Sequence, residues 1–435
     1  MPVKLQHQLK QNLIWRGLYF ALSFITTVCI SRILKAEANG DYSYFLTVLS
    51  LIVLIVSFNV ESAFTYYLSA KIISLKKLIV IALSIFIFIY ALVYFIFKSA
   101  YYDQQLISIS NLQINVYQCS INYFCGIILI SFATAILYGL QNFKTSNYVL
   151  CFASIIFFII IGYRFYFNHH PFLVVSDFCL ITLLTGILLF VILIVQYKAY
   201  KNITLPSIKD YKSIYSYASI IMLSNLVFFF VYKLDYNFVK NWCNSSSDLG
   251  NYLQASKFAQ ILLVVPQILA STIFPLVAKQ NQKNEIVEII GRLIRLFSTL
   301  FLAIFIIFLI IGKWFFPFLF GETFNKMYLP TVILIPGIYF LATSSLFSAY
   351  FSGTKKNRVN LYGAITAIFV MVGLSFACKN FYSIRIAAVI SLVAYATEAC
   401  YVAFHYYKIE GRFSFREVLI FSKADYKWLK ETFRG

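Results

Sequence analysis

The sequence predicts an all-α integral membrane protein of about twelve transmembrane helices, which fall into two six-helix lobes. Three observations support this prediction: the composition, the length of the apolar runs and an internal repeat. Of the 435 residues, 61% are hydrophobic and only 12% are charged, whereas soluble globular proteins carry about 25% charged residues. So few charges do not cover a water-facing surface of this size, which excludes a soluble enzyme. The high hydrophobicity also excludes intrinsic disorder.

Twelve apolar runs are long enough to cross a membrane, because a transmembrane helix needs about 20 apolar residues to span roughly 30 Å of hydrocarbon. Strands are excluded, since the runs are too long and continuous for a barrel and every backbone polar group in lipid needs a partner. We expect helices over residues 12–31, 42–64, 78–97, 116–140, 147–167, 174–197, 215–234, 251–277, 288–311, 329–352, 359–378 and 385–407.

The distribution of Lys and Arg predicts the orientation. The two termini and one set of alternate loops carry 23 of these residues, and the opposite set of loops carries 9. Because basic residues concentrate on the cytoplasmic side of a membrane protein, we expect both termini to be cytoplasmic. The same rule accounts for most of the formal net charge of +20, so no nucleic-acid partner is expected.

The sequence contains none of the common catalytic or cofactor-binding motifs. It has no Walker sequence, no GxSxG and no HExxH. The eight Cys form no CxxC pair, and together with the four His they show no metal-ligand spacing. We therefore expect a transporter and not an enzyme, with no cofactor, no metal and no catalytic residue.

An internal repeat divides the chain. Gly40 and Tyr42, at the start of the second predicted span, recur as Gly250 and Tyr252 at the start of the eighth. A shift of six spans is even, so both halves have the same orientation, which is typical of one class of transporters. We expect an N-terminal lobe 1–197, a cytoplasmic basic linker 198–214, a C-terminal lobe 215–407 and a tail 408–435 that lies as an interfacial helix on the inner leaflet.

Four charged residues lie inside predicted spans or close to their ends: Arg16, Glu61, Lys257 and Arg295. A charge at the bilayer centre costs about 2.5–3.5 kcal/mol, so these side chains should face a hydrated interior or one another. Lys257 shares a polar helix face with Gln260, which indicates an inward orientation. The alternative is structural: Arg16 and Arg295 extend to the membrane surface, and Glu61 pairs with a nearby Lys.

The eighth predicted span also contains two prolines, Pro266 and Pro275. Proline removes a backbone donor from the helical ladder, so we expect this helix to bend. Because the bent helix carries Lys257, it is a candidate moving element.

Several short motifs follow one another along the chain: Ser31–Leu34 followed by Asn39–Tyr42, then Leu234 and Asp235 with Gly250, Tyr252, Ala255, Pro266, Phe274 and Pro275, and finally Leu319–Glu322. In this order and spacing they resemble those of the Wzx-type polysaccharide flippases of the MOP (multidrug/oligosaccharidyl-lipid/polysaccharide) exporter superfamily. The likeness follows most of the chain. Lys35 stands where the family commonly has Gly, and residues 380–385 replace its Gly-rich turn.

The resemblance implies two six-helix lobes around a central cavity in the bacterial cytoplasmic (inner) membrane. It also implies a cargo, an undecaprenyl-pyrophosphate-linked oligosaccharide such as an O-antigen or other surface-polysaccharide repeat unit, moved from the inner to the outer leaflet. Arg16 and Lys257 are expected to hold the pyrophosphate, with Gln260, Arg295 and Glu61 as further substrate-binding residues. Membrane lipids, an H⁺ or Na⁺ coupling ion and polysaccharide-assembly proteins are the other expected partners.

Two other functions remain open at the level of sequence. An ion-coupled small-molecule antiporter resembling the MATE transporters needs acidic residues deep in the protein, for which Glu61, Asp235 and Glu398 are the candidates. A membrane polysaccharide polymerase or glycosyltransferase needs a long outer loop that carries acidic residues or Arg. The predicted outer loops are short, which disfavours the enzyme.

Overall fold

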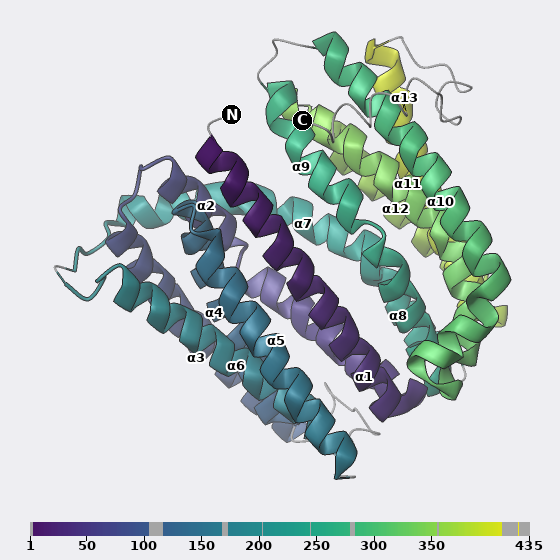
Figure 1. Cartoon of the computed structure of the whole chain (residues 1–435), viewed down its shortest axis with the longest axis horizontal. Helices are drawn as coiled ribbons and strands as arrows, with labels where there is room; N and C mark the ends of the chain where they lie inside the picture. Colours follow the sequence, from purple (N-terminus) through teal and green to yellow (C-terminus); the bar gives the residue numbers. More distant parts are fainter. Residues whose placement is uncertain are drawn as a thin grey trace. The chain divides into compact units, whose positions relative to one another are not determined.

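The computed structural model describes residues 3–103, 116–167, 173–201, 203–243, 245–278, 283–354, 356–410 and 425. Within these residues all regular secondary structure is helical, which confirms the predicted fold class (Figure 1). The chain divides into two compact units, Met1–Leu226 and Val227–Gly435. The division falls inside a helix, α7, which begins at Ile208 within the segment 198–214 that the sequence predicts as a linker.

The N-terminal unit contains six helices and the first half of a seventh. Its helices are α1 (Val3–Val56), α2 (Val60–Ser69), α3 (Leu75–Asp103), α4 (Val116–Gly139), α5 (Phe143–Tyr166), α6 (Leu173–Gln196) and the start of α7 (Ile208–Trp242).

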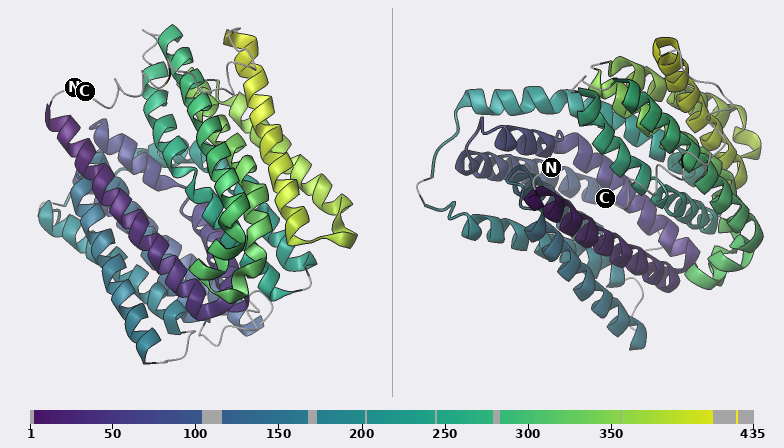
Figure 2. Two further views of the ribbon diagram at one scale, coloured as in Figure 1. Left: turned by 45° about the vertical axis from the view of Figure 1, so that its right-hand side comes forward. Right: turned by 45° about the horizontal axis from the view of Figure 1, so that its top comes forward.

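α1 contains the first predicted span and most of the second, joined at a sharp turn. Lys35, at φ 58 and ψ 179, interrupts the helical backbone. Ser31 Oγ lies 3.5 Å from Asn39 Oδ1, although eight residues of straight helix span about 12 Å. The chain therefore turns back at Lys35 (Figure 2).

The second predicted span, 42–64, is wrong as a continuous helix. It breaks at residues 57–59, where Phe58 (φ 53) and Asn59 (φ 54) both adopt left-handed backbone conformations. A left-handed residue cannot continue a right-handed helix, so α2 starts afresh at Val60.

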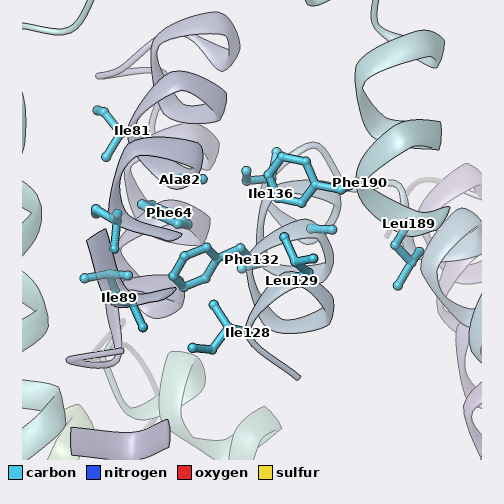
Figure 3. Close-up of a cluster of buried hydrophobic side chains, with 14 of the residues drawn as sticks. Phe64, Ile81, Ala82, Ile89, Ile128, Leu129, Phe132, Ile136, Leu189 and Phe190 are labelled. Carbon is cyan, nitrogen blue, oxygen red and sulfur yellow. The ribbon is translucent and has the colours of Figure 1, made fainter. Parts of the chain in front are cut away.

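The core of the N-terminal unit forms where α4 meets α2 and α6. Phe64 of α2 packs edge-on against Phe132 of α4, with ring centroids 5.2 Å apart (Figure 3). Gly126 of α4 faces the backbone of α6 so closely that an added Cβ would lie 2.4 Å from the carbonyl carbon of Thr182. Small residues at such crossings let helix backbones approach each other.

The C-terminal unit contains the rest of α7 and the remaining helices. They are α8 (Ser246–Ile261), α9 (Val264–Ala278), α10 (Lys283–Phe320), η1 (Glu322–Met327), α11 (Tyr328–Gly353), α12 (Arg358–Ala377), η2 (Lys379–Phe381) and α13 (Ile384–Glu410). α11 packs against α8, α9, α10 and α13 and is the central helix of this unit.

The predicted bend in the eighth span is present. α8 and the start of α9 meet at an angle of 42° across a short break. Pro266, in the first turn of α9, has no N–H to donate to the carbonyl of Leu262, so the ladder opens there.

Ten helices of the described part are long and apolar enough to cross a membrane, and the bent pair α8–α9 adds an eleventh. The 40-residue stretch Gly17–Val56 counts as one of the ten, yet at 1.5 Å per residue it is about 60 Å long. That length is twice the hydrocarbon thickness, so its two arms on either side of Lys35 each span it. The protein is therefore a multi-pass membrane protein, and the helices are consistent with about twelve crossings.

Candidate functional site

A cavity of about 260 Å³ opens in the C-terminal unit beside the break between α8 and α9. α7 contributes two aromatic rings and an ammonium group to its wall, and the broken helix contributes two amides. The lining residues are Phe229, Tyr232, Lys233, Gln260, Leu263 and Gln267. The combination of one cation, two amides and aromatic faces suits a polar, anionic ligand.

Lys233 is held in place by its neighbours. Its Nζ donates to Gln260 Oε1 at 3.1 Å and to the Tyr236 hydroxyl at 3.0 Å. The ammonium also lies 4.7 Å from the centroid of the Tyr236 ring, a cation–π contact. These contacts fix the charge at the wall of the cavity.

The hydrogen bonds around Lys233 form a closed ring. The Tyr236 hydroxyl donates to Ser256 Oγ at 2.9 Å, and Gln260 Nε2 donates to the same oxygen at 3.0 Å. The ring therefore ties α7 to α8 through four side chains. A ligand anion that draws Lys233 away from Gln260 breaks one link and leaves the other three in place.

A second cation lies near this ring. Lys257 is half-buried on α8, and its charge and that of Lys233 repel each other. Two like charges in a membrane-embedded site are costly, and an anion bound between or beside them lowers that cost. Lys257 remains a predicted substrate-binding residue.

A buried carboxylate lies next to the ring on α7. Asp235 is 1% exposed, and its Oδ2 accepts hydrogen bonds from the Tyr252 hydroxyl at 2.5 Å and from Ser391 Oγ at 2.9 Å. Its Oδ1 accepts from the backbone N–H of Tyr236 at 3.0 Å. Asp235 thus joins α7, α8 and α13 and is occupied by protein donors.

A second buried carboxyl group, Glu398 on α13, is less completely bonded. It is 3% exposed, and its Oε1 accepts from Ser344 Oγ of α11 at 2.9 Å. Its Oε2 is buried and has no hydrogen-bond partner among the described residues. Glu398 interacts electrostatically with Tyr232 at the cavity wall.

Two of the predicted site residues, Arg16 and Glu61, belong to the N-terminal unit. Arg16 lies on α1, but its side chain is outside the described residues. Glu61 is the second residue of α2, and its Oε2 is buried without a hydrogen-bond partner in the part of the unit that the structure describes. No Lys or Arg pairs with Glu61 among the described ion pairs, so the predicted pairing with a nearby Lys is not seen there.

Arg295 has an acidic partner that the sequence did not indicate. Its Nε lies 2.9 Å from Asp425 Oδ2 and its Nη2 lies 2.7 Å from Asp425 Oδ1, a bidentate pair. Asp425 is the one described residue of the tail that follows Glu410, so the predicted interfacial helix over 408–435 lies largely outside the described residues. With its charge matched by Asp425, Arg295 is a weaker candidate for substrate binding than Lys257.

The sequence did not predict Lys233 as a site residue, because it lies at the very end of the seventh predicted span, 215–234, where a Lys was counted with the loop charges. α7 continues beyond this predicted span to Trp242, and Lys233 lines the cavity. The helix continues because Phe238 and Val239 are buried apolar residues beyond the charged pair. The i, i+3 spacing of Lys233 and Tyr236 on one helix face was the available signal.

The architecture and the polar cavity define the class of fold: it is the fold of transporters of the MOP superfamily. No family model and no curated protein matches the chain. The fold is therefore established from solved structures alone.

Three solved structures show the likeness. The lipid II flippase MurJ in an inward closed conformation has a TM-score of 0.72 at 13% identity, covering 97% of this chain and 92% of MurJ. An inward-facing multidrug resistance MATE transporter has a TM-score of 0.66 at 13% identity, covering 91% and 96%. A MOP transporter from Pyrococcus furiosus, described by a binding pocket of reverse polarity, has a TM-score of 0.60 at 13% identity, covering 92% and 94%.

Proposed function

We propose that this protein is a flippase that moves an undecaprenyl-pyrophosphate-linked oligosaccharide, an O-antigen or other surface-polysaccharide repeat unit, from the inner to the outer leaflet of a bacterial cytoplasmic membrane. The observation that carries the proposal is a pair of interacting cations: Lys233, which lines the polar cavity, and Lys257, whose charge interacts with that of Lys233. The fold shared with MOP transporters, among them a lipid II flippase, supports it.

The chemistry of the cavity fits a pyrophosphate. The ammonium group of Lys233 carries a positive charge and three N–H donors, which can form charge-assisted hydrogen bonds to phosphate oxygens. Gln260 and Gln267 add amide donors to the same wall. When the anionic ligand binds, Lys233 exchanges its hydrogen bond to Gln260 for stronger hydrogen bonds to phosphate oxygens. The new bonds therefore offset the free energy lost with the old one.

The remaining predicted residues take subordinate roles in this proposal. Arg16 contributes a second phosphate contact from the N-terminal lobe 1–197, and Arg295 contributes only when Asp425 releases it. Glu61 tunes or releases the grip on the anion, or carries the coupling H⁺ or Na⁺. Both termini are cytoplasmic, and the lobes alternate access to the cargo by rocking.

The direct test is complementation of a deletion strain with Lys257→Ala and Lys233→Ala, measured as surface polysaccharide per molecule of membrane-inserted protein. We expect both variants to lose most of the polysaccharide at normal abundance. Lys201→Ala, which removes an exposed cation, is the matched control and retains the polysaccharide. Normal polysaccharide from both site variants contradicts the proposal.

A MATE-like small-molecule antiporter is the second candidate. The buried carboxyl groups of Asp235 and Glu398 favour it, because organic-cation and ion-coupled transport needs acids within the membrane. A deletion strain that becomes sensitive to cationic drugs, with unchanged surface polysaccharide, selects this function over the flippase.

A further inference from the structure

A group of tyrosines lies at one surface of the N-terminal unit. Tyr66 and Tyr67 come from α2, and Tyr215 and Tyr217 come from the start of α7; we call this group the tyrosine platform. The rings of Tyr66 and Tyr217 stack with centroids 4.7 Å apart and planes 10° from parallel. Tyr67 stands edge-on to both, at 5.2 Å from Tyr66 and 6.0 Å from Tyr217.

The chain is anchored on both sides of the platform. The Tyr67 hydroxyl donates to the backbone carbonyl of Ser213 at 3.0 Å, which ties α2 to α7. Phe58 packs edge-on against Tyr215, at 5.8 Å between centroids. Phe58 and Asn59 form the left-handed break that starts α2. Non-glycine residues rarely adopt this conformation unless the surrounding structure enforces it, and such residues concentrate at functional positions.

The platform is exposed and its surroundings are polar. Tyr66 is 44% and Tyr215 is 36% exposed, while Tyr67 and Tyr217 are half-buried. Lys212, Ser216 and Ser69, which lie close to these tyrosines in the sequence, are also exposed. The lipid-facing helices of the unit differ sharply: the exposed residues of α6 are almost all Leu, Ile and Val. Hydroxyls and ammonium groups at this density indicate a water-facing surface.

Aromatic faces combined with hydroxyl groups are suited to sugars. A pyranose ring presents a face of polarised C–H bonds, which the negative face of an aromatic ring attracts. The sugar hydroxyls form hydrogen bonds with Tyr and Ser side chains. Tyr loses little conformational entropy on binding, and Ser adapts its hydrogen bonds to the ligand. The exposed Lys212 on the same helix gives the platform a positive edge that suits a phosphate-linked glycan.

We propose that the tyrosine platform binds the saccharide part of the lipid-linked cargo. This inference rests on the proposed flippase function and adds to it a site for the glycan that is separate from the cations assigned to the pyrophosphate. Stacking on an aromatic ring depends little on which sugar is bound, so we expect the platform to distinguish a glycolipid from a bare lipid but not one glycan from another.

The test uses the full chain in nanodiscs and two probes: undecaprenyl pyrophosphate, and the same lipid carrying chitotriose. We expect the double variant Tyr66→Ala/Tyr217→Ala to bind the glycolipid at least tenfold more weakly than the wild type and the bare lipid within twofold. Tyr66→Phe/Tyr217→Phe keeps the stack and should bind the glycolipid within about threefold of wild type. Tyr163→Ala, which removes another exposed ring, tilted at 46° against Phe167, is the control and changes neither affinity.

Each outcome decides between the alternatives. Unchanged glycolipid binding by the double alanine variant refutes glycan binding at the platform. An equal loss of affinity for both probes refutes it too, because it indicates a structural role or an interfacial anchor of the kind aromatic residues form in membranes. If the wild type binds neither probe, the flippase function fails and the platform fails with it. If the wild type binds both probes and only the alanine variant discriminates between them, both proposals stand.

Discussion

Replacing Lys233 by Met is the most informative perturbation of the cavity, because it removes the charge and keeps the length of the side chain. In the wild type, Nζ makes hydrogen bonds of 3.1 Å to Gln260 and 3.0 Å to Tyr236. The variant leaves Gln260 Oε1 without its donor, a cost of about 1–3 kcal/mol for a buried acceptor. It also removes the repulsion between Lys233 and Lys257, which offsets part of this cost. We therefore expect the free energy of unfolding to change by less than about 2 kcal/mol.

The effect on ligand binding is larger than the effect on stability. A charge-assisted hydrogen bond is worth about 1.5–3 kcal/mol, which corresponds to a roughly 10- to 150-fold change in affinity. We expect undecaprenyl pyrophosphate to bind the Lys233→Met variant weaker by that factor, measured in nanodiscs, with thermal unfolding followed on the same samples. Lys240→Met, two turns further along α7, is the control. An unchanged affinity for Lys233→Met refutes the assignment of the cavity to the pyrophosphate.

Three further predictions follow from single contacts. Gly126→Ala places a Cβ within 2.4–2.5 Å of backbone atoms of Thr182 and Leu183. The resulting overpacking should cost about 1–3 kcal/mol or more and lower the midpoint of thermal unfolding. Gly162→Ala is the control: its Cβ meets no atom within 4 Å, and it should leave the midpoint unchanged. Glu398→Gln retains a hydrogen bond to Ser344 and should keep normal abundance in membranes, and an equal loss for Gln and Ala variants contradicts this. A double-mutant cycle on Arg295 and Asp425 should give a coupling energy of at least about 1 kcal/mol in thermal unfolding, and additive effects exclude the pair.

The fold was accessible from the sequence because apolar length is a local property. A run of about 20 apolar residues has to cross the bilayer wherever it lies in the chain, so the spans over 116–140, 147–167 and 174–197 agree closely with α4, α5 and α6. The bend near Pro266 is equally local, since a missing N–H acts on its own helix. These features need no knowledge of the neighbouring helices.

Helix ends and partners were less accessible because they depend on packing. Lys233 lies at the very end of the predicted span 215–234, and only the burial of Phe238 and Val239 shows that α7 continues beyond it. The break at Phe58 and Asn59 is likewise invisible in an apolar run, since neither residue is a strong helix breaker.

The sequence by itself determined that this chain is an all-helical membrane protein with buried cations, because the bilayer imposes a strict rule on length and polarity. The family resemblance singled out Lys35 as a departure from the usual Gly, and the structure shows Lys35 at a positive φ that Gly adopts most readily. Only the tertiary structure decided which polar groups meet. Lys233, Tyr236, Ser256 and Gln260 form one ring, and Arg295 pairs with Asp425 from 130 residues away, because side-chain contacts depend on how helices cross and no local pattern encodes that crossing.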